Sequence, residues 1–165
     1  MARSALAEIT LRPITDNDEG FLRLVYAGVR SDELALVDWT DEQKQGFLRM
    51  QFDAQHSYYA EHFPEAQFLI IQRGERPVGR LYVDRRETEI SIIEIALLPE
   101  ERNAGIGSAL LRQILEEAAR VSKPVRIHVE RFNPALRLYQ RLGFAPIQEQ
   151  GLFLLMEWRR FPDIK

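Results

Sequence analysis

Along the chain, segments in which hydrophobic residues recur with the period of a strand alternate with segments in which they recur with the period of a helix. This pattern predicts short strands and amphipathic helices. Alternation, or an almost continuous apolar run, is typical of strands, and helical spacing of apolar residues is typical of helices. The strands are expected at 9–14, 68–72, 77–85, 89–98, 125–131, 145–149 and 152–158. The helices are expected at 16–30, 40–62, 105–121 and 133–143. This order predicts an α/β (α+β) fold, a mixed central sheet of about six to seven strands flanked by about four helices.

Local residues mark the ends of two of these helices. Thr40 and Gln43, in the run T-D-E-Q, fit a capping box at the start of the second helix. Pro134 opens the last helix and Gly143 ends it. The third helix carries one apolar stripe, which we expect to pack on the sheet. Its residues are Leu110, Leu111, Ile114, Leu115 and Ala118.

Length and composition narrow the class of protein. At 165 residues the chain is expected to form a single domain over 1–165, and 45% apolar with 28% charged residues is typical of a globular protein. The absence of cysteine excludes disulfides and thiolate metal sites, and three histidines without H-x-x-x-H spacing predict no metal site. The opening MARSALAEIT has no long apolar segment and no later run is long enough to cross a bilayer, so we expect a cytoplasmic protein without a membrane partner.

The charge of the chain argues against a nucleic-acid partner. Its net charge is −3, whereas such partners favour strongly basic proteins. Basic residues nevertheless gather in the second half, and a phosphorylated small molecule is enough to explain them. They are Arg102, Arg112, Arg120, Lys123 and Arg126.

The stretch LLPEERNAGIGSALL at 97–111 joins a predicted strand to a predicted helix. The first N–H groups of a helix have no partner within it and lie at the positive end of its dipole, so they bind anions. Gly105 and Gly107 let a phosphate approach those groups, and Arg102 adds charge-assisted hydrogen bonds. The run is not a P-loop, and it departs from the dinucleotide fingerprint G-x-G-x-x-G at Leu110. Taken alone, the two glycines also fit a tight turn without a ligand.

Two motifs here resemble those of the GNAT superfamily of N-acetyltransferases. Residues 102–107, R-N-A-G-I-G, resemble its acetyl-CoA motif [QR]-x-x-G-x-[GA], and residues 133–144, N-P-A-L-R-L-Y-Q-R-L-G-F, resemble its motif N-x-x-A-x-x-L-Y-x-x-x-G-F. Tyr139 follows Asn133 by six residues, one fewer than is common in the family. The resemblance implies the GNAT acyl-CoA N-acyltransferase fold, whose sheet would splay apart between the strands at 89–98 and 125–131.

The resemblance also implies that acetyl-CoA is the acyl donor and binds where these strands separate. Its pantetheine arm would pair with backbone groups of the first strand, and the N–H groups that open the next helix would hold the pyrophosphate. An N–H at or near Leu97 would stabilise the oxyanion. The residues implied in this binding are Leu97, Leu98, Arg102, Asn103, Ala104, Gly105, Ile106, Gly107, Ser108 and Asn133.

Tyr139 and Glu94 are the candidate catalytic residues. The resemblance makes Tyr139 the expected general acid for the departing CoA thiolate, with ring packing on the sheet as the alternative. Glu94 is the only charged residue between positions 90 and 98, in an apolar strand, and is the candidate base for the acceptor amine. The alternatives are a salt bridge with Arg80, a base role for Glu89, or catalysis without a fixed base.

The resemblance places the acceptor side at the connection of the first two helices, at 31–40. Asp32, Glu33 and Asp38 would attract a cationic amine, and Trp39 would stack on it. His128 could reach the same pocket. The alternatives are a solvated loop, an anchoring tryptophan and a structural histidine. Aromatic stripes on the second helix would serve the core or a homodimer.

Together these features predict an N-acetyltransferase that moves the acetyl group of acetyl-CoA to a primary amine by direct attack in a ternary complex. A small-molecule acceptor is favoured over a protein because the charge is low and the chain is compact. A non-catalytic module that senses CoA or a nucleotide is the alternative, and Tyr139 and Asn133 count against it because a sensor needs no acid. A dinucleotide-dependent oxidoreductase is disfavoured by Leu110.

Overall fold

The structure of the protein, a computed structural model, describes residues 8–160 and contains a seven-stranded mixed sheet. The strand order across the sheet is β1-β2-β3-β4-β5-β7-β6, and all neighbours are antiparallel except β4 and β5. The strands are β1 (Ile9–Pro13), β2 (Gln67–Arg73), β3 (Arg76–Arg85), β4 (Ile90–Leu97), β5 (Val125–Glu130), β6 (Ala145–Gln150) and β7 (Phe153–Trp158). This arrangement confirms the predicted mixed sheet.

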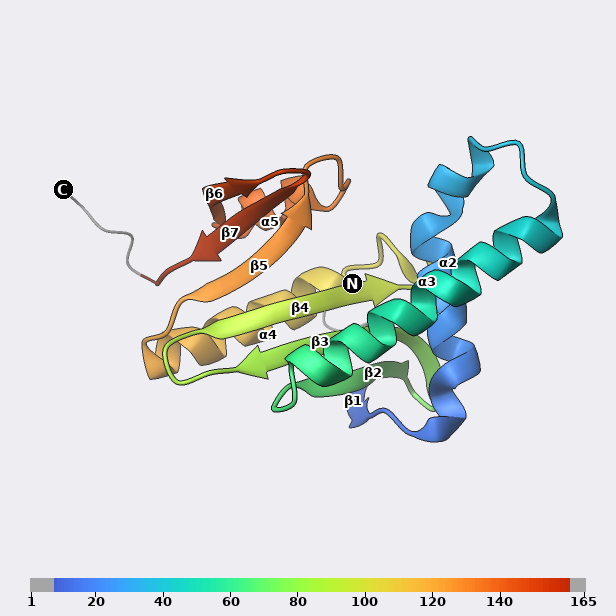
Figure 1. The fold of residues 1–165 in the computed structure, drawn as a ribbon. Coiled ribbons are helices and arrows are strands. Elements are labelled where there is room, and N and C mark those ends of the chain that lie inside the picture. The colour runs from blue at the N-terminus through green and yellow to red at the C-terminus, as the bar shows by residue number, and fades with distance from the viewer. Residues whose placement is uncertain (1–7, 161–165) are drawn as a thin grey trace.

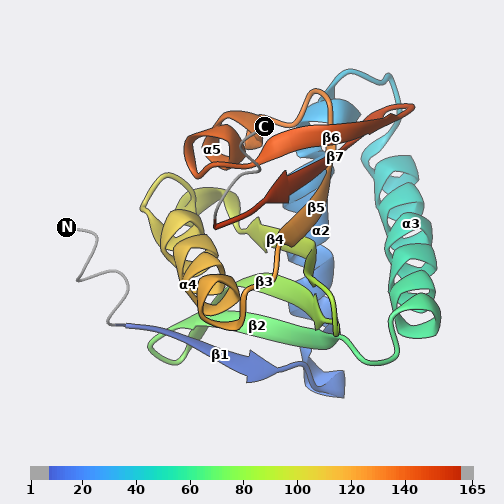
Figure 2. The ribbon, with the colours of Figure 1, turned by 90° about the vertical axis from the view of Figure 1, so that its left-hand side faces the viewer.

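Helices cover both faces of the sheet. They are α2 (Glu19–Ala35), α3 (Asp41–His62), α4 (Ile106–Val121) and α5 (Leu136–Arg141), with the 3-10 turns η1 (Asp16–Asp18) and η2 (Pro99–Glu101). Figures 1 and 2 show α4 and α5 on one face and α2 and α3 on the other. The predicted stripe of α4 is buried against the first face, where it joins the main hydrophobic core. A smaller core of Leu22, Tyr26, Phe52 and Ile70 lies on the second face.

Two helix starts show where local sequence does and does not decide the fold. The capping box of α3 is present: the N–H of Gln43 donates to Thr40 Oγ1 (3.1 Å), and the N–H of Thr40 donates to Gln43 Oε1 (2.9 Å). The last helix is shorter than predicted. Asn133 Oδ1 accepts the N–H of Ala135 at 2.8 Å, which forms a turn, and α5 begins only at Leu136.

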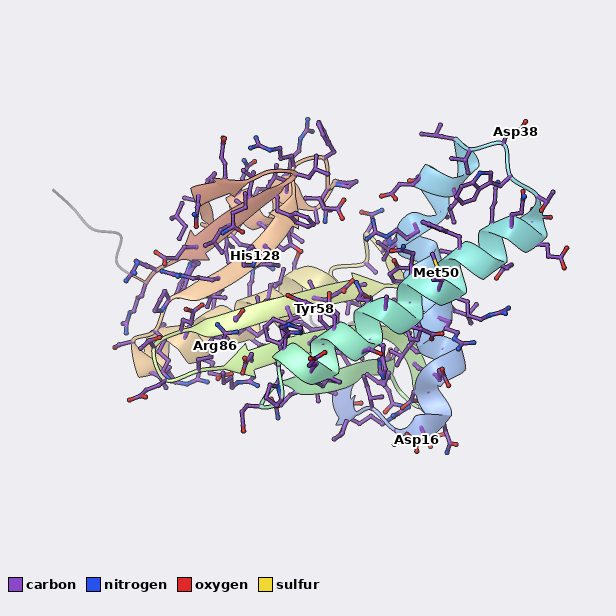
Figure 3. All side chains as sticks on the ribbon, viewed as in Figure 1. Asp16, Asp38, Met50, Tyr58, Arg86 and His128 are labelled. Carbon is purple, nitrogen blue, oxygen red and sulfur yellow. The ribbon has the colours of Figure 1, made fainter. Side chains whose placement is uncertain are left out.

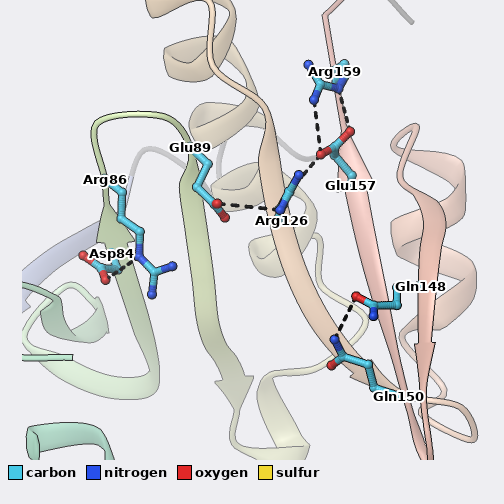
Figure 4. Close-up of polar contacts among 8 residues, drawn as sticks. All are labelled: Asp84, Arg86, Glu89, Arg126, Gln148, Gln150, Glu157 and Arg159. Atoms are coloured by element: carbon cyan, nitrogen blue, oxygen red, sulfur yellow. Dashed lines mark hydrogen bonds and ion pairs between the residues drawn. The ribbon is translucent and has the colours of Figure 1, made fainter. Parts of the chain in front are cut away.

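The sheet splays apart as predicted between β4 and β5. The two strands pair in parallel only over 90–92 and 125–127, and they diverge beyond this point (Figure 1). At the paired end, Arg126 on β5 contacts Glu89 at 3.8 Å and Glu157 on β7 at 2.8 Å (Figure 4). Arg126 therefore links Glu89, just before β4, to β7, and Glu89, the alternative base, is engaged there.

Candidate active site

A cleft of about 750 Å³ opens where β4 and β5 diverge. Its walls come from α2, the end of β4, the turn into α4, and α5 with the segment that precedes it. It brings together most of the predicted site residues. They are Glu94, Leu97, Arg102, Asn103, Gly105, Ile106, Gly107, Ser108, Asn133 and Tyr139. Asp32, expected on the acceptor side, also lines the cleft, as do Gly28, Val29, Arg137 and Arg141, which sequence reasoning did not select.

Several predicted residues do not line this cleft. Asp38, Trp39 and His128, expected on the acceptor side, are exposed outside this cleft (Figure 3 labels Asp38 and His128), so their place in an acceptor pocket stays a prediction. Helix α2 continues to Ala35, about a turn further than predicted, and carries the connection with Asp38 outward. Trp39 packs edge-to-face on Phe47, with ring centroids 5.2 Å apart, in the anchoring role named as its alternative.

Leu98 and Ala104 are likewise not lining residues of the cleft. The N–H of Leu98 donates to the carbonyl of Val78 on β3 at 2.9 Å, so it is not available to a ligand. Because backbone groups alternate along a strand, the N–H and carbonyl of Leu97 turn to the edge of β4 that β5 leaves unpaired. That edge can pair with an extended ligand.

The start of α4 has free N–H groups and open space of the kind that can hold an anion. Gly105 precedes the helix with φ +84°, a left-handed conformation that favours glycine, and no side chain of the described residues caps it. The first helical hydrogen bond runs from the N–H of Ala109 to the carbonyl of Gly105, which leaves the preceding helical N–H groups without an intrahelical partner. A Cβ on Gly107 would meet nothing within 4 Å, so the fold itself leaves open space there. A phosphate fits this space.

Arg102 is held beside this turn by β4 and lies close to Gly28 of α2. Its Nε donates to the carbonyl of Leu97 at 3.2 Å. A Cβ on Gly28 of α2 would lie 3.0 Å from Pro99 Cδ and 3.8 Å from Arg102 Nη2. Glycine in the middle of α2 therefore allows the helix to contact the phosphate turn closely, at a helix-propensity cost of about 1 kcal/mol.

Glu94 lies in a polar cluster on the α2–α3 face of the sheet. Arg80 Nη2 is 3.0 Å from Glu94 Oε1, and the hydroxyl of Tyr59 on α3 donates to Glu94 Oε2 at 3.2 Å. Arg80 is 1% exposed, and its guanidinium lies 5.1 Å from the ring centroid of Tyr82. Burial, and then the charge of Glu94, raises the pKa of Tyr59 well above its ordinary value. The salt bridge named as an alternative is thus present, while Glu94 also lines the cleft.

Tyr139 is packed in the core and also lines the cleft. Its ring is buried and packs edge-to-face on Phe144 at 5.9 Å, yet the residue lines the cleft. Burial, and then the charge of Glu94, raises the pKa of Tyr139 to about 12. A thiolate is a weaker base than this buried phenolate, so full transfer of the proton to it would be uphill. The environment therefore favours a hydrogen bond to sulfur over an early proton transfer.

Within residues 8–160, no group of three or more His, Asp or Glu side chains is arranged to hold a metal ion. In the same part of the chain, no helix is both long and apolar enough to span a membrane.

The fold and the cleft define an acyl-CoA N-acyltransferase architecture, and the comparisons with known proteins agree. A family model described as "Acetyltransferase (GNAT) domain" matches residues 64–146, just over half of the 165 residues. The match includes β4, the turn into α4, and Tyr139. The chain therefore belongs to the GNAT acetyltransferase family.

Solved structures share this fold at low sequence identity. The PaiA N-acetyltransferase of Thermoplasma acidophilum, in complex with coenzyme A, has a TM-score of 0.69 and 16% identity over 92% of this chain and 98% of its own. The ribosomal-protein-S18-alanine N-acetyltransferase of Escherichia coli has a TM-score of 0.62 and 13% identity over 92% and 93%. A GNAT acetyltransferase of Elizabethkingia anophelis with acetyl-CoA bound has a TM-score of 0.53 and 19% identity over 92% and 98%. No curated protein matched the chain.

Proposed function

We propose that residues 1–165 form one N-acetyltransferase domain that transfers the acetyl group of acetyl-CoA to a primary amine by direct attack in a ternary complex. One observation carries this proposal. The uncapped start of α4, the unpaired edge of β4, Glu94 and Tyr139 all belong to one cleft. A diphosphate, an extended thioester arm and a reacting amine would therefore meet in it.

The residues of the cleft fit acetyl-CoA, which when bound would supply an activated thioester. The N–H groups of Ile106, Gly107 and Ser108 would bind its diphosphate, and Arg102 would add positive charge. The open edge of β4 would hold the extended arm, and the N–H of Leu97 would donate to the thioester oxygen as negative charge develops on it. Holding both reactants in one cleft removes about 7–11 kcal/mol of barrier at best.

Glu94 would receive a proton from the acceptor, directly or through a water. An alkylammonium has no lone pair, and its pKa of about 10.4 keeps it protonated at neutral pH, so a base in the cleft is needed. Arg80 and Tyr59 each occupy one carboxylate oxygen of Glu94 and so fix its direction. Each oxygen has a second lone pair with which it can accept the proton.

Tyr139 would donate a hydrogen bond to the departing sulfur. Its raised pKa keeps the phenol protonated at neutral pH, so the donor is always present. As the thiolate forms, its growing negative charge strengthens this hydrogen bond in the transition state.

For the acceptor we infer a small cationic amine. Asp32 on α2 lines the cleft with Glu94 and would attract a positive charge. The name of the Escherichia coli structure shows that a protein acceptor occurs on this fold, so peptides belong in the test. A homodimer through the exposed Met50 and Tyr58 of α3, a cytoplasmic location and the lack of a nucleic-acid partner stay predictions.

The purified protein with acetyl-CoA and a panel of small amines, polyamines and peptides tests this function. Release of free CoA thiol and the mass of the acetylated product are measured. Tyr139→Phe keeps the ring but removes the hydroxyl, so we expect kcat to fall by about 10²-fold or more with little change in KM. Tyr58→Phe removes an exposed hydroxyl outside the cleft and should leave kcat unchanged.

The results separate the candidate functions. An unchanged kcat in Tyr139→Phe would make Tyr139 structural. Tight CoA binding without turnover of any amine would favour the sensing module over the enzyme.

A further inference from the structure

Helix α5 presents two arginines to the cleft that the proposed reaction does not use. Arg137 and Arg141 are four residues apart, so they share one face of the helix. Both line the cleft, next to the segment at 133–135 that also lines it. Neither belongs to the basic cluster that the sequence suggested, of which only Arg102 reaches the cleft.

Within the part of the chain that the structure describes, these two charges lack a partner, unlike most arginines there. Arg85 pairs with Glu117 and Arg126 with Glu157, for example, at 2.7 and 2.8 Å. Neither Arg137 nor Arg141 forms an ion pair or side-chain hydrogen bond with any of residues 8–160. Two unpaired guanidinium groups on one wall of a cleft attract an anion.

The charge of the whole cleft points the same way. Three arginines, Arg102, Arg137 and Arg141, line it together with only two carboxylates. One of these, Glu94, is already compensated by the buried Arg80. The cleft is therefore net positive even before the helix dipole of α4 is counted.

Coenzyme A offers one anion more than the start of α4 can hold. Its diphosphate would occupy the N–H groups that open α4, whereas its third phosphate, on the 3′ position of the ribose, is a separate dianion. We propose that Arg137 and Arg141 bind this 3′-phosphate, so that the domain selects CoA over 3′-dephospho-CoA. The planar guanidinium binds phosphate oxygens in pairs, which favours arginine over lysine for this role. The inference rests on the proposed function, because it needs CoA in the cleft.

Binding of CoA and of 3′-dephospho-CoA, measured separately by titration calorimetry, tests this inference without any need for turnover. The wild type should bind CoA at least about 10-fold more tightly than 3′-dephospho-CoA, as expected for a charge-assisted contact. Arg137→Gln and Arg141→Gln should each weaken CoA by about 10-fold and leave 3′-dephospho-CoA unchanged. In the double variant the two ligands should bind almost equally.

Two controls separate this contact from a general effect of charge. Arg49→Gln removes an exposed arginine of α3 outside the cleft and should change neither affinity. Arg141→Lys keeps the charge but loses the planar fork, so it should retain part of the preference for CoA.

Three results would overturn the inference. An equal loss for both ligands in the glutamine variants would assign the arginines to the diphosphate. If the glutamine variants bind both CoA ligands as the wild type does and only the KM for the amine rises, the arginines would belong to the acceptor site. CoA binding without any preference over 3′-dephospho-CoA in the wild type would refute the site and leave the proposed function intact, whereas no binding of CoA would remove both.

Discussion

The ion pair of Arg80 with Glu94 allows a test in which stability and catalysis respond differently. Glu94→Gln keeps the shape and one accepting oxygen of the side chain, but it leaves the charge of Arg80 without compensation. Arg80 is 1% exposed and cannot reach water without a change in packing. Breaking a buried pair by removing one partner costs about 3–5 kcal/mol.

The cost of removing the charge of Glu94 should be lower than for a fully buried pair. Its side chain is 17% exposed and lines the cleft, so water there screens part of the uncompensated charge. We therefore expect Glu94→Gln to lower the free energy of unfolding by about 2–3 kcal/mol. In a chain of this length, that change lowers Tm by about 4–12 °C. Tyr59→Phe removes only the hydrogen bond from the phenol to the Glu94 carboxylate and should cost about 1.5–3 kcal/mol.

The double variant Arg80→Met/Glu94→Gln distinguishes charge compensation from lost packing. Methionine restores an apolar group without a charge, so the double variant should be more stable than the sum of the two single changes predicts, by about 1–3 kcal/mol. Urea unfolding at pH 7 measures the free energy of unfolding of the wild type, of Arg80→Met and Glu94→Gln alone, and of the double variant. Strict additivity, or a loss below about 0.5 kcal/mol in Glu94→Gln, would show that the pair does not stabilise the fold in solution.

The same variants separate stability from catalysis. In conditions where each variant is fully folded, Glu94→Gln and the double variant should both lose about 10²-fold or more in kcat, because neither has a base. The double variant would then be more stable than the sum of its parts yet inactive. Recovery of activity together with stability would refute the role of Glu94 as base.

Two further predictions concern the packing of the phosphate turn and the stability of the fold. Gly28→Val places new atoms against Pro99 and should weaken CoA binding by about 10-fold through displacement of the phosphate turn; Gly46→Ala, where a Cβ meets nothing within 4 Å, should leave binding unchanged and stabilise α3 by about 1 kcal/mol. Asp18 accepts hydrogen bonds from both Nη atoms of Arg12 at 2.8 Å, and this pairing holds the pKa of Asp18 well below its usual range. Its stabilisation is therefore complete above the unfolded pKa of about 3.9 and lost as the pH falls below it. Asp18→Asn should cost about 1–3 kcal/mol in urea unfolding at pH 7 and less at pH 3, and an equal cost at both would contradict this assignment.

The elements of the fold could be predicted because their causes are local. The apolar stripe of α4 and the capping box at Thr40 are set by residues within a few positions of one another. The two helix ends that differed depend on more than periodicity. The side chain of Asn133 accepts a hydrogen bond within a turn, so α5 starts later than predicted. Helix α2 continues past residue 30 and ends at Ala35.

The site was predictable in part for the same reason. The phosphate turn is one contiguous motif, so its residues meet wherever the strand and helix form. Gly28 and Arg137 come from other elements, and only the packing of α2 and α5 around the cleft reveals them. His128 is exposed because Ile127 and Val129, its neighbours on β5, face the core, and this alternation turns His128 to the opposite face.

The position of Glu94 depends on one extra residue that periodicity does not predict. Strict alternation along β4 would place Glu94 on the same face as Ile92, which lies in the core beneath α4. Val83 of β3 lies opposite Ile92, but the next residue of β3, Tyr82, lies opposite Glu94. Ile93 therefore has no partner on β3 and forms a β-bulge. The bulge turns Glu94 to the face of α3, where Tyr59 binds it. The pairing of β4 with β5 also ends at Ile92. Because a bulge bends its strand, we infer that Ile93, which turns the candidate base Glu94, also begins the divergence that opens the cleft.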